Sequence, residues 1–308
     1  MSFPDRAAIA AAHQRIAGDI RRTPILRLRD GLELKLELLQ VSGSFKPRGA
    51  FNRMRAAGLP GAGVIAASGG NHGAAVAFAA RALGARAEIF VPELASPAKR
   101  ALIEGLGARL IVGGATYDEA RQASEARAAG TGALLVHAYD QAEVLAGQGT
   151  VAREWAEQSP GLTHLLVAVG GGGLIGGMAA WLREGGPSLV AVEPEGCPCL
   201  SVALREGRPV PAPVGGLAAD SLGARQVGAL MFPLAAGLHA EGRLEPVLVP
   251  DGAIRAAQRH LWAEARLVAE PGGAAALAAL LSGRWVPPEG ARVGVLVCGA
   301  NTDPGTVG

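Results

Sequence analysis

The chain has 308 residues, of which 49% are apolar, so it can bury a core large enough for two lobes or one large α/β domain. Its net charge is +2 and its basic residues are scattered, which excludes the clustered basic face of a nucleic-acid-binding protein. No window of the sequence reaches 18 uncharged apolar residues, and charged residues from Asp5 to Arg21 interrupt the N-terminus, so we expect neither a membrane span nor a signal peptide. Three cysteines are few and odd in number, which fits a reducing compartment and predicts a cytoplasmic protein.

The predicted elements alternate between strands and helices along most of the chain. A first helix over residues 5–20 ends before Thr23-Pro24. The expected strands cover residues 25–28, 32–38, 64–67, 87–91, 109–112, 134–137, 165–169, 189–193 and 293–297. The expected helices beyond the first cover residues 47–57, 74–83, 97–106, 117–129, 143–157, 174–184, 251–266 and 271–282. This alternation predicts parallel strands with crossover helices, arranged as two α/β lobes with a ligand site between them.

The segment from Ser42 to Ala50 places a lysine beside an aromatic ring, just ahead of a predicted helix. Pro47 suits the first helical position, because its missing N–H would have no partner there. A residue before proline is pushed out of the helical region, so Lys46 is expected in extended backbone at the mouth of the helix. In a dry, partly cationic site its amine would be free and able to form a Schiff base with a carbonyl compound.

Two glycine loops each follow a predicted strand and open a helix. The first, Ser68 to Gly73, would direct backbone N–H groups outward and so could bind a carboxylate or phosphate. The second, Gly170 to Gly173, could close its amides around a phosphate. It also satisfies the dinucleotide pattern, with Glu193 placed like the acidic residue that binds a ribose, so a nicotinamide-dependent dehydrogenase is a competing interpretation. That interpretation leaves the lysine segment unexplained.

Taken together, these segments resemble the serine/threonine dehydratase family of fold-type II pyridoxal-phosphate enzymes. The resemblance covers nearly the whole chain, from Arg22-Thr23-Pro24 to Cys298-Gly299-Ala300-Asn301. It rests on Gly43-Ser44-Phe45-Lys46-Pro47-Arg48-Gly49-Ala50, Ser68-Gly69-Gly70-Asn71-His72-Gly73, Gly170 to Gly173 and Val192-Glu193-Pro194, in that order.

The resemblance implies a two-lobed fold-type II architecture and a set of site residues. Lys46 would hold pyridoxal 5'-phosphate as a Schiff base with Phe45 beside the ring, and Asn71 would bond the phenolic oxygen. Glu270 would lie near the ring and Cys298 would face its nitrogen. The phosphate would be held by backbone amides of Gly170, Gly171, Gly172, Gly173 and Leu174. The substrate carboxylate would be surrounded by Ser68, Gly69, Asn71 and His72.

The implied reaction is the dehydration and deamination of a β-hydroxy amino acid, such as L-threonine or L-serine, to a 2-oxo acid and ammonia. Lys46, once freed, would act as the base on Cα. The cofactor supplies the electron sink, and a thiol opposite its ring nitrogen would favour rapid loss of the β-hydroxyl.

Two departures from the family pattern refine this expectation. Racemases of the group carry a second serine where this chain has Gly69, so racemisation is expected to be weak. Some members hold a cation with Glu193 and an acidic residue six positions later, where this chain has Cys199. A divalent site is therefore not favoured, although a monovalent cation held by backbone carbonyls and Glu193 remains open.

Several properties stay as alternatives or are implied only by the resemblance. A large domain would combine residues 1–57 and 140–308, with residues 58–139 as a smaller mobile domain, and the chain would form a homodimer. A related enzyme could instead carry out racemisation, β-replacement or threonine synthesis. Residues near 115–140 and 213–223 would shape the side-chain pocket, and their Ala- and Gly-rich lining could admit an aryl or extended hydroxy amino acid.

Overall fold

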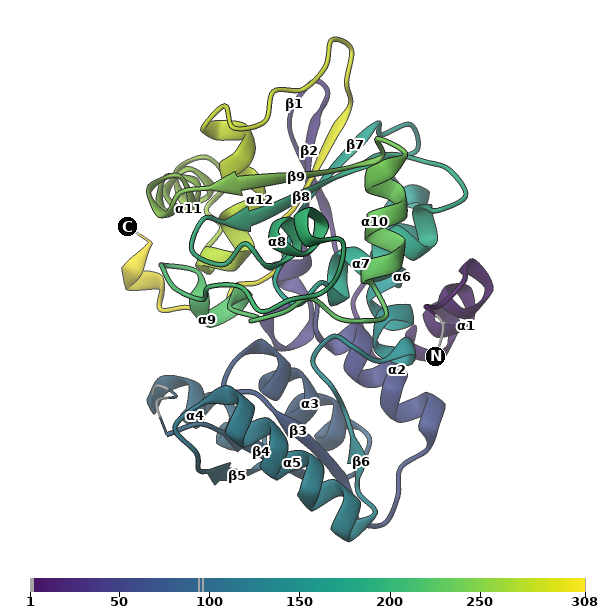
Figure 1. Ribbon diagram of the computed structural model, residues 1–308, viewed down its shortest axis with the longest axis vertical. Coiled ribbons are helices and arrows are strands. Elements are labelled where there is room, and N and C mark those ends of the chain that lie inside the picture. The colour runs from purple at the N-terminus through teal and green to yellow at the C-terminus, as the bar shows by residue number, and fades with distance from the viewer. Residues whose placement is uncertain (1–2, 94, 96, 308) are drawn as a thin grey trace.

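The computed structural model describes residues 3–93, 95 and 97–307 of the chain. It contains two β-sheets, each flanked by helices, as Figure 1 shows. Six strands form the sheet in the upper half of that view and four form the sheet in the lower half. The predicted two-lobed α/β fold is confirmed.

The six-stranded sheet brings together strands from both halves of the chain. Its order is β1 (Ile25–Arg29), β2 (Leu32–Lys35), β10 (Val293–Leu296), β7 (His164–Ala168), β8 (Ser188–Pro194) and β9 (Leu244–Val249). Only the β1–β2 pair is antiparallel. Parallel strands of this kind are buried on both faces, and β7, β8 and β10 are accordingly almost continuous runs of Val, Leu and Ala.

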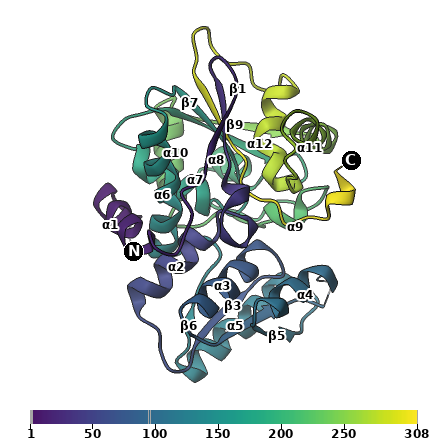
Figure 2. The ribbon, with the colours of Figure 1, turned by 180° about the vertical axis from the view of Figure 1, so that it is seen from behind.

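Helices cover both faces of this sheet (Figures 1 and 2). On one face α12 (Pro271–Leu281) packs directly on the strands, with α11 (Asp251–Ala265) beside it. On the other face lie α6 (Ala142–Gln158), α7 (Gly173–Leu182) and α10 (Phe232–Ala240). The small helices α8 (Cys199–Glu206) and α9 (Ala219–Leu222) follow β8, and the 3-10 turn η3 (Pro304–Thr306) follows β10.

The four-stranded sheet is wholly parallel and comes from one continuous stretch of chain. Its order is β5 (Arg109–Val112), β4 (Ala87–Val91), β3 (Val64–Ala67) and β6 (Leu134–Leu135). The crossover helices are α3 (Asn71–Ala82), α4 (Pro97–Gly105) and α5 (Tyr117–Thr131). Helix α2 (Pro47–Ala57) lies between the two sheets, where it packs on both α6 and α3, and α1 (Arg6–Ile16) packs on α6.

Several predicted boundaries are wrong in ways that bear on the site. The first helix ends at Ile16 rather than residue 20, close to Gly18. Strand β2 ends at Lys35 rather than residue 38, because its neighbour β10 ends opposite it, and the chain then winds into the 3-10 turns η1 (Glu37–Leu39) and η2 (Val41–Gly43). Strand β6 has two residues instead of four, because the chain turns toward the site. Elements α8, α9, α10 and β9 were not predicted.

Among the described residues, no helix has the length and apolar composition needed to cross a membrane.

Candidate active site

The lysine segment connects η2 to α2 between the two sheets. Lys46 is the N-cap of α2 and Pro47 is its first residue, so the expected place at the helix mouth is confirmed. The expected extended backbone is wrong, because Lys46 has φ −56° and ψ −34°, in the helical region. The chain is already wound there: the N–H of Arg48 donates to Phe45 O (3.2 Å) and the N–H of Ala50 donates to Lys46 O (3.2 Å).

The amine of Lys46 lies in a desolvated position. Its Nζ donates to Ala138 O at 2.7 Å, and it stands 5.2 Å from the centre of the Phe45 ring. Burial lowers the pKa of Lys46 to about 8, against the opposing effects of Cys298 and Glu270. The expected free amine is therefore favoured by desolvation, and neighbouring positive charge is not its cause.

The loop after β10 pairs with the lysine segment. The N–H of Phe45 donates to Cys298 O (3.1 Å), and the N–H of Ala300 donates to Gly43 O (2.9 Å). The Cys298 thiol is buried and lies 3.5 Å from Gly272 O. Burial, with Glu270 nearby, raises the pKa of Cys298, so the thiol is neutral.

Three amide and carboxylate side chains meet beside this loop. Asn71, the first residue of α3, donates through Nδ2 to Glu270 Oε1, and its Oδ1 accepts from Asn301 Nδ2 at 2.7 Å. The structure thus brings Asn71 and Glu270 together, as the sequence-based site requires. Asn301 was not predicted as a site residue, and its role depends on contacts between residues far apart in the sequence.

The second glycine loop lies between β7 and α7, and its shape depends on the absence of side chains. Gly172 has φ 85°, which favours glycine. A Cβ on Gly171 would overlap the ring of Tyr139, and one on Gly173 would lie 2.7 Å from Tyr139 Cβ. Gly170 is similarly close to Leu222, at 3.1 Å. Because the loop runs into the N-terminal turn of α7, which contains Leu174, it forms an anion-binding geometry.

Residues 137–140 join this loop to the lysine segment. The Tyr139 ring packs edge-on against His137, with centroids 4.8 Å apart, and its hydroxyl donates to Gln226 O (3.3 Å). The Asp140 carboxylate accepts from the N–H groups of Ala229 (3.0 Å) and Leu230 (2.9 Å). The sequence range 115–140 was expected near the substrate, but Tyr139 was not singled out.

The first glycine loop lies between β3 and α3, beside the lysine. Ser68 Oγ accepts from the N–H of Gly70 at 3.1 Å, and Gly69 and Gly70 are partly exposed. The His72 ring instead faces inward, where Nε2 contacts Val136 O at 2.8 Å. Burial, with Lys46 nearby, lowers the pKa of His72 to about 3, so the ring is neutral and donates to that carbonyl. The His72 ring is therefore held by Val136 O, so only the backbone of this residue could contribute to an anion site at the start of α3.

Glu193 is buried at the end of β8, where its carboxylate accepts hydrogen bonds from the first residues of α8. Its carboxylate accepts from the N–H of Leu200 (2.6 Å), the N–H of Ser201 (2.8 Å) and the Ser201 hydroxyl (2.5 Å). These bonds leave it poorly placed for a ribose, which counts against the dinucleotide interpretation. In the described part of the chain, no group of three or more His, Cys, Asp and Glu side chains is arranged to hold a metal ion.

A buried ion network supports the lysine segment from the opposite side. Arg48, fully buried, donates to both oxygens of Glu37 (2.8 and 2.7 Å) and to Glu154 Oε2 (3.0 Å). Lys35 contacts Glu154 Oε1 and donates to Thr23 O at 2.8 Å. Two cations and two carboxylates are thus paired within the core, and they fix α2, β2 and α6 relative to one another.

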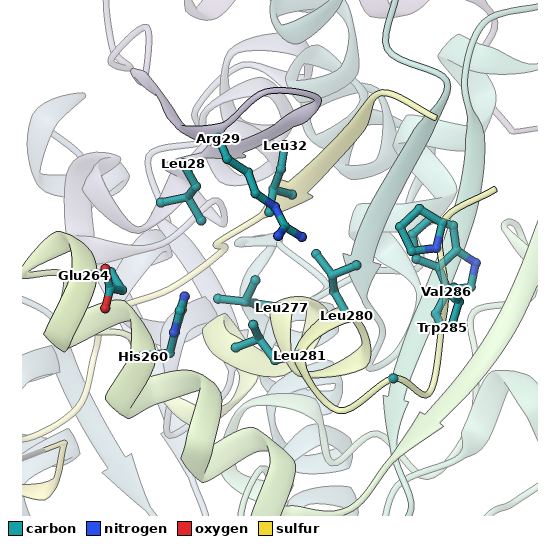
Figure 3. Close-up of a pocket in the computed structure, with 12 residues that line it drawn as sticks. Leu28, Arg29, Leu32, His260, Glu264, Leu277, Leu280, Leu281, Trp285 and Val286 are labelled. Atoms are coloured by element: carbon teal, nitrogen blue, oxygen red, sulfur yellow. The ribbon is translucent and has the colours of Figure 1, made fainter. Parts of the chain in front are cut away.

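A separate apolar groove of about 460 Å³ lies on the six-stranded sheet, away from these residues. Figure 3 shows its lining from the β1–β2 hairpin, α11, α12 and the segment after α12, with Arg29, His260 and Glu264 among the leucines. None of the residues predicted for the catalytic site lines it.

Comparison with known proteins gives a consistent result. Residues 16–299 match the family described as pyridoxal-phosphate dependent enzyme. The chain is similar to a phenylserine dehydratase of Ralstonia pickettii, with 35% identity over 99% of this chain and 95% of the relative. It is also similar to an L-threonine ammonia-lyase of Geobacter sulfurreducens, with 36% identity over 97% of this chain and 76% of the relative.

Solved structures agree with these relatives. Maize serine racemase superposes with a TM-score of 0.89 at 31% identity, covering 98% of this chain and 95% of the racemase. A threonine deaminase from T.th. gives a TM-score of 0.88 at 34% identity, covering 97% of this chain and 99% of the deaminase. The nicotinamide-dependent alternative is thereby overturned, and the predicted lyase class is confirmed. The chain belongs to the family of pyridoxal-phosphate dependent enzymes, among relatives that are dehydratases and ammonia-lyases.

Proposed function

We propose that this chain dehydrates and deaminates a β-hydroxy amino acid, giving a 2-oxo acid and ammonia. The observation that carries the proposal is the position of Lys46. Its amine, with a pKa lowered to about 8, donates to Ala138 O in the segment that contacts the glycine loop. Glu270, which accepts from Asn71, lies close enough to affect that pKa.

The residues present fit pyridoxal phosphate. Gly170 to Gly173 form a loop whose closeness to Tyr139, Met231 and Leu222 leaves no room for a Cβ, so only backbone amides are presented to an anion. Phe45 offers an aromatic surface next to Lys46, and Cys298 and Glu270 are close enough to Lys46 to affect its pKa. When bound, the cofactor supplies an electron sink for charge that develops at Cα of the substrate.

Protein residues carry out the proton transfer, bind the substrate carboxylate and control the charge beside the cofactor. Lys46 Nζ takes the Cα proton, for which an amine with a pKa near neutrality is suited. The N-terminal turn of α3, with Ser68 and the backbone of Asn71, binds the substrate carboxylate through hydrogen bonds and the helix dipole. Cys298 stays neutral because burial raises the pKa of its thiol, so it brings no negative charge to the ring nitrogen.

We also propose the domain division into residues 1–57 with 140–308, and residues 58–139. The sheet topology supports it, since the four-stranded sheet uses only β3 to β6 and the six-stranded sheet uses the rest. Movement of the smaller unit would open and close the site between the sheets.

We propose that the substrates include an aryl β-hydroxy amino acid in addition to threonine and serine. The chain has two tyrosines, and Tyr117 lies close enough to Tyr139 to contribute, after burial, to the raised pKa of Tyr139. A cavity of about 10 Å³, lined in part by Tyr117, Arg121 and Ala138, adjoins the carbonyl that contacts Lys46. This space holds about one water molecule, so an aryl side chain would enter only if movement of the smaller unit widened it. Aromatic edges at this place would favour such a side chain, and one relative carries the name phenylserine dehydratase.

Racemisation is proposed to be weak. Gly69 offers no hydroxyl for the second face of the substrate, and a Cβ at this position would lie 3.1 Å from Ala95 Cβ, so a serine would fit only after a small shift. Exchange of the Cα configuration faster than elimination would contradict this proposal.

The test is a product assay on purified enzyme loaded with pyridoxal phosphate. L-Threonine, L-serine and phenylserine are supplied separately, and 2-oxo acid and ammonia are measured together with the configuration of unreacted substrate. Equal amounts of 2-oxo acid and ammonia support the proposal, and the ratio of kcat/KM values ranks the substrates. Turnover without ammonia release would instead favour β-replacement or threonine synthesis.

We propose a homodimer that uses the groove of Figure 3. Val286 is 73% exposed and Leu281 is 44% exposed at the groove, which is an apolar surface that association would cover. Among the described residues, neither Arg29 nor Glu264 has an ion-pair partner, and both line this groove. In a twofold interface a patch that carries both charges is complementary to itself.

Charge reversal tests this interface. Arg29→Glu and Glu264→Arg should each raise the dimer dissociation constant about tenfold, and the double variant should largely restore it. The exposed residues Arg208 and Glu104 lie outside the groove and provide matched reversals as controls. Sedimentation that finds a monomer throughout, or a dimer indifferent to both single changes, would contradict the proposal.

Two further expectations remain predictions. A monovalent cation beside Glu193 predicts potassium-dependent activity, and equal activity in sodium and potassium would contradict it. A cytoplasmic location is supported by three cysteines without disulfide bonds and is tested by fractionation.

A further inference from the structure

Asn301 connects two segments of the site that are far apart in the sequence. It lies in the loop after β10, and its Nδ2 donates to Ser42 O at 2.9 Å and to Asn71 Oδ1 at 2.7 Å. Asn71 in turn donates through Nδ2 to Glu270 Oε1. These contacts form a relay from the lysine segment through Asn301 and Asn71 to Glu270.

The direction of this relay is fixed by its first member. Ser42 O is a backbone carbonyl and can only accept, so the amide nitrogen of Asn301 must face it. The same nitrogen faces Asn71, which places the Asn71 oxygen toward Asn301 and the Asn71 nitrogen toward Glu270. An isolated asparagine amide could adopt either orientation, whereas this one has a single favourable arrangement.

Two glycines provide the space that the relay occupies. A Cβ on Gly43 would overlap Asn301 Oδ1, and Gly43 also has φ 76°. A Cβ on Gly299 would overlap Glu270 Oε1. The backbone around the relay therefore excludes side chains at both places where they would displace its members.

The relay also spans the two sheets. Asn71 begins α3, which packs on the four-stranded sheet, whereas Ser42, Glu270 and Asn301 belong to segments of the six-stranded sheet. Asn301 thus contacts the smaller unit at the residue expected to meet the cofactor.

We propose that Asn301 is a positioning residue that holds the Asn71 amide with its NH2 group turned into the site. The second hydrogen of that NH2 group is then available for the contact with the phenolic oxygen expected of Asn71. This inference rests on the proposed function for its benefit to catalysis, while the orientation of Asn71 is a property of the protein alone.

The first test measures the cofactor dissociation constant from the visible absorbance of the lysine-bound cofactor. Asn301→Ala should raise this constant about tenfold, the size expected when one buried hydrogen-bond partner is lost. Asn301→Asp should raise it further, because a carboxylate of the same shape would face two acceptors. Thr302→Ala is the matched control, since within the described part of the chain the Thr302 hydroxyl contacts only Thr306, on the surface.

A double-mutant cycle decides whether Asn301 acts through Asn71. Asn71→Ala with Asn301→Ala should bind the cofactor as weakly as Asn71→Ala alone. A full additional loss in the double variant, or an Asn301→Ala protein that binds like Thr302→Ala, would overturn the inference while leaving the proposed function intact. A wild-type protein that never binds the cofactor would instead contradict the proposed function.

A cofactor-free measurement tests the inference independently. Amide hydrogen exchange in the first turn of α3 should be several-fold faster in Asn301→Ala than in Thr302→Ala, because Asn71 loses its fixed partner. Equal exchange in the two variants would overturn the inference. If Asn301→Ala does not fold, Asn301→Ser replaces it in both comparisons.

Discussion

Two of the three lysines in this chain, Lys35 in the buried ion network and Lys46 in the lysine segment, differ in their partners. Lys35 is fully buried and contacts the Glu154 carboxylate, Thr23 O and Gln158 Oε1 (2.6 Å). Lys46 donates to a neutral carbonyl, Ala138 O. Burial lowers the pKa of both amines, but only Lys35 has a carboxylate in direct contact that favours its charged form.

The difference separates a structural cation from a reactive amine. The paired charges around Lys35 compensate one another and leave no capacity for chemistry. The amine of Lys46 has a pKa of about 8 and lies among groups that fit a cofactor, so it can be nucleophile and base. Burial by itself therefore does not identify a catalytic lysine. The two amines are distinguished by the group that each contacts directly, which is a carboxylate for Lys35 and a neutral carbonyl for Lys46.

The largest effect is expected from Lys46→Ala. Loss of the cofactor-binding amine and of the base should lower kcat by at least about a thousandfold and abolish the visible absorbance of the lysine-bound cofactor. Lys35→Met provides the contrast, because its folded fraction should retain that absorbance. Loss of the absorbance in Lys35→Met at full folding would break the distinction between the two lysines.

Lys35→Met should instead reduce the free energy of unfolding by about 3–5 kcal/mol, because it leaves the Glu154 carboxylate buried beside a missing cation. Removal of Glu154 in the same chain, as Lys35→Met with Glu154→Leu, should recover much of this loss. Urea denaturation measures both variants. If the double variant loses as much free energy of unfolding as the two single variants together, the Lys35 and Glu154 charges do not compensate each other.

A smaller effect concerns pH. The rate at which cofactor-free enzyme captures pyridoxal phosphate should rise about tenfold per pH unit below pH 8 and level off above it, following the free amine of Lys46. Between about pH 8 and the usual lysine pKa of 10.5 the unfolded chain binds more protons, so the contribution of Lys46 to stability increases with pH in this window. A capture rate that keeps rising to pH 10 would show an ordinary lysine.

Much of the fold could be predicted because strand and helix periods are local properties. The alternating segments from Val64 to Pro194 were placed to within a few residues, whereas β9 was missed. That strand contains Pro246 and lies at the edge of its sheet, where a missing N–H is tolerated, so its local pattern is weak. The helical backbone of Lys46 was also missed, because tertiary contacts override the usual preference of a residue before proline.

The site was predictable to the extent that its residues lie in short motifs. Lys46, Asn71 and the glycine loop belong to such motifs, and the structure brings the first two to the same loop after β10. Asn301, although it ends the last matching motif, and Tyr139 were given no role, because each contacts partners that only the folded sheet order brings near. The buried ion pairs of Arg48 with Glu37 and Glu154 could not be predicted either. A charged residue in a sequence does not show whether its side chain will be paired in the core.

The central position of β10 has a consequence for biosynthesis. This strand lies between β2 and β7, although both are translated long before it. The six-stranded sheet therefore contains a gap until residues 293–296 leave the ribosome, whereas the four-stranded sheet can assemble earlier from one continuous stretch. Because residues 298–301 follow immediately and complete the surroundings of Lys46, a nascent chain cannot present a finished lysine site before its last strand is inserted.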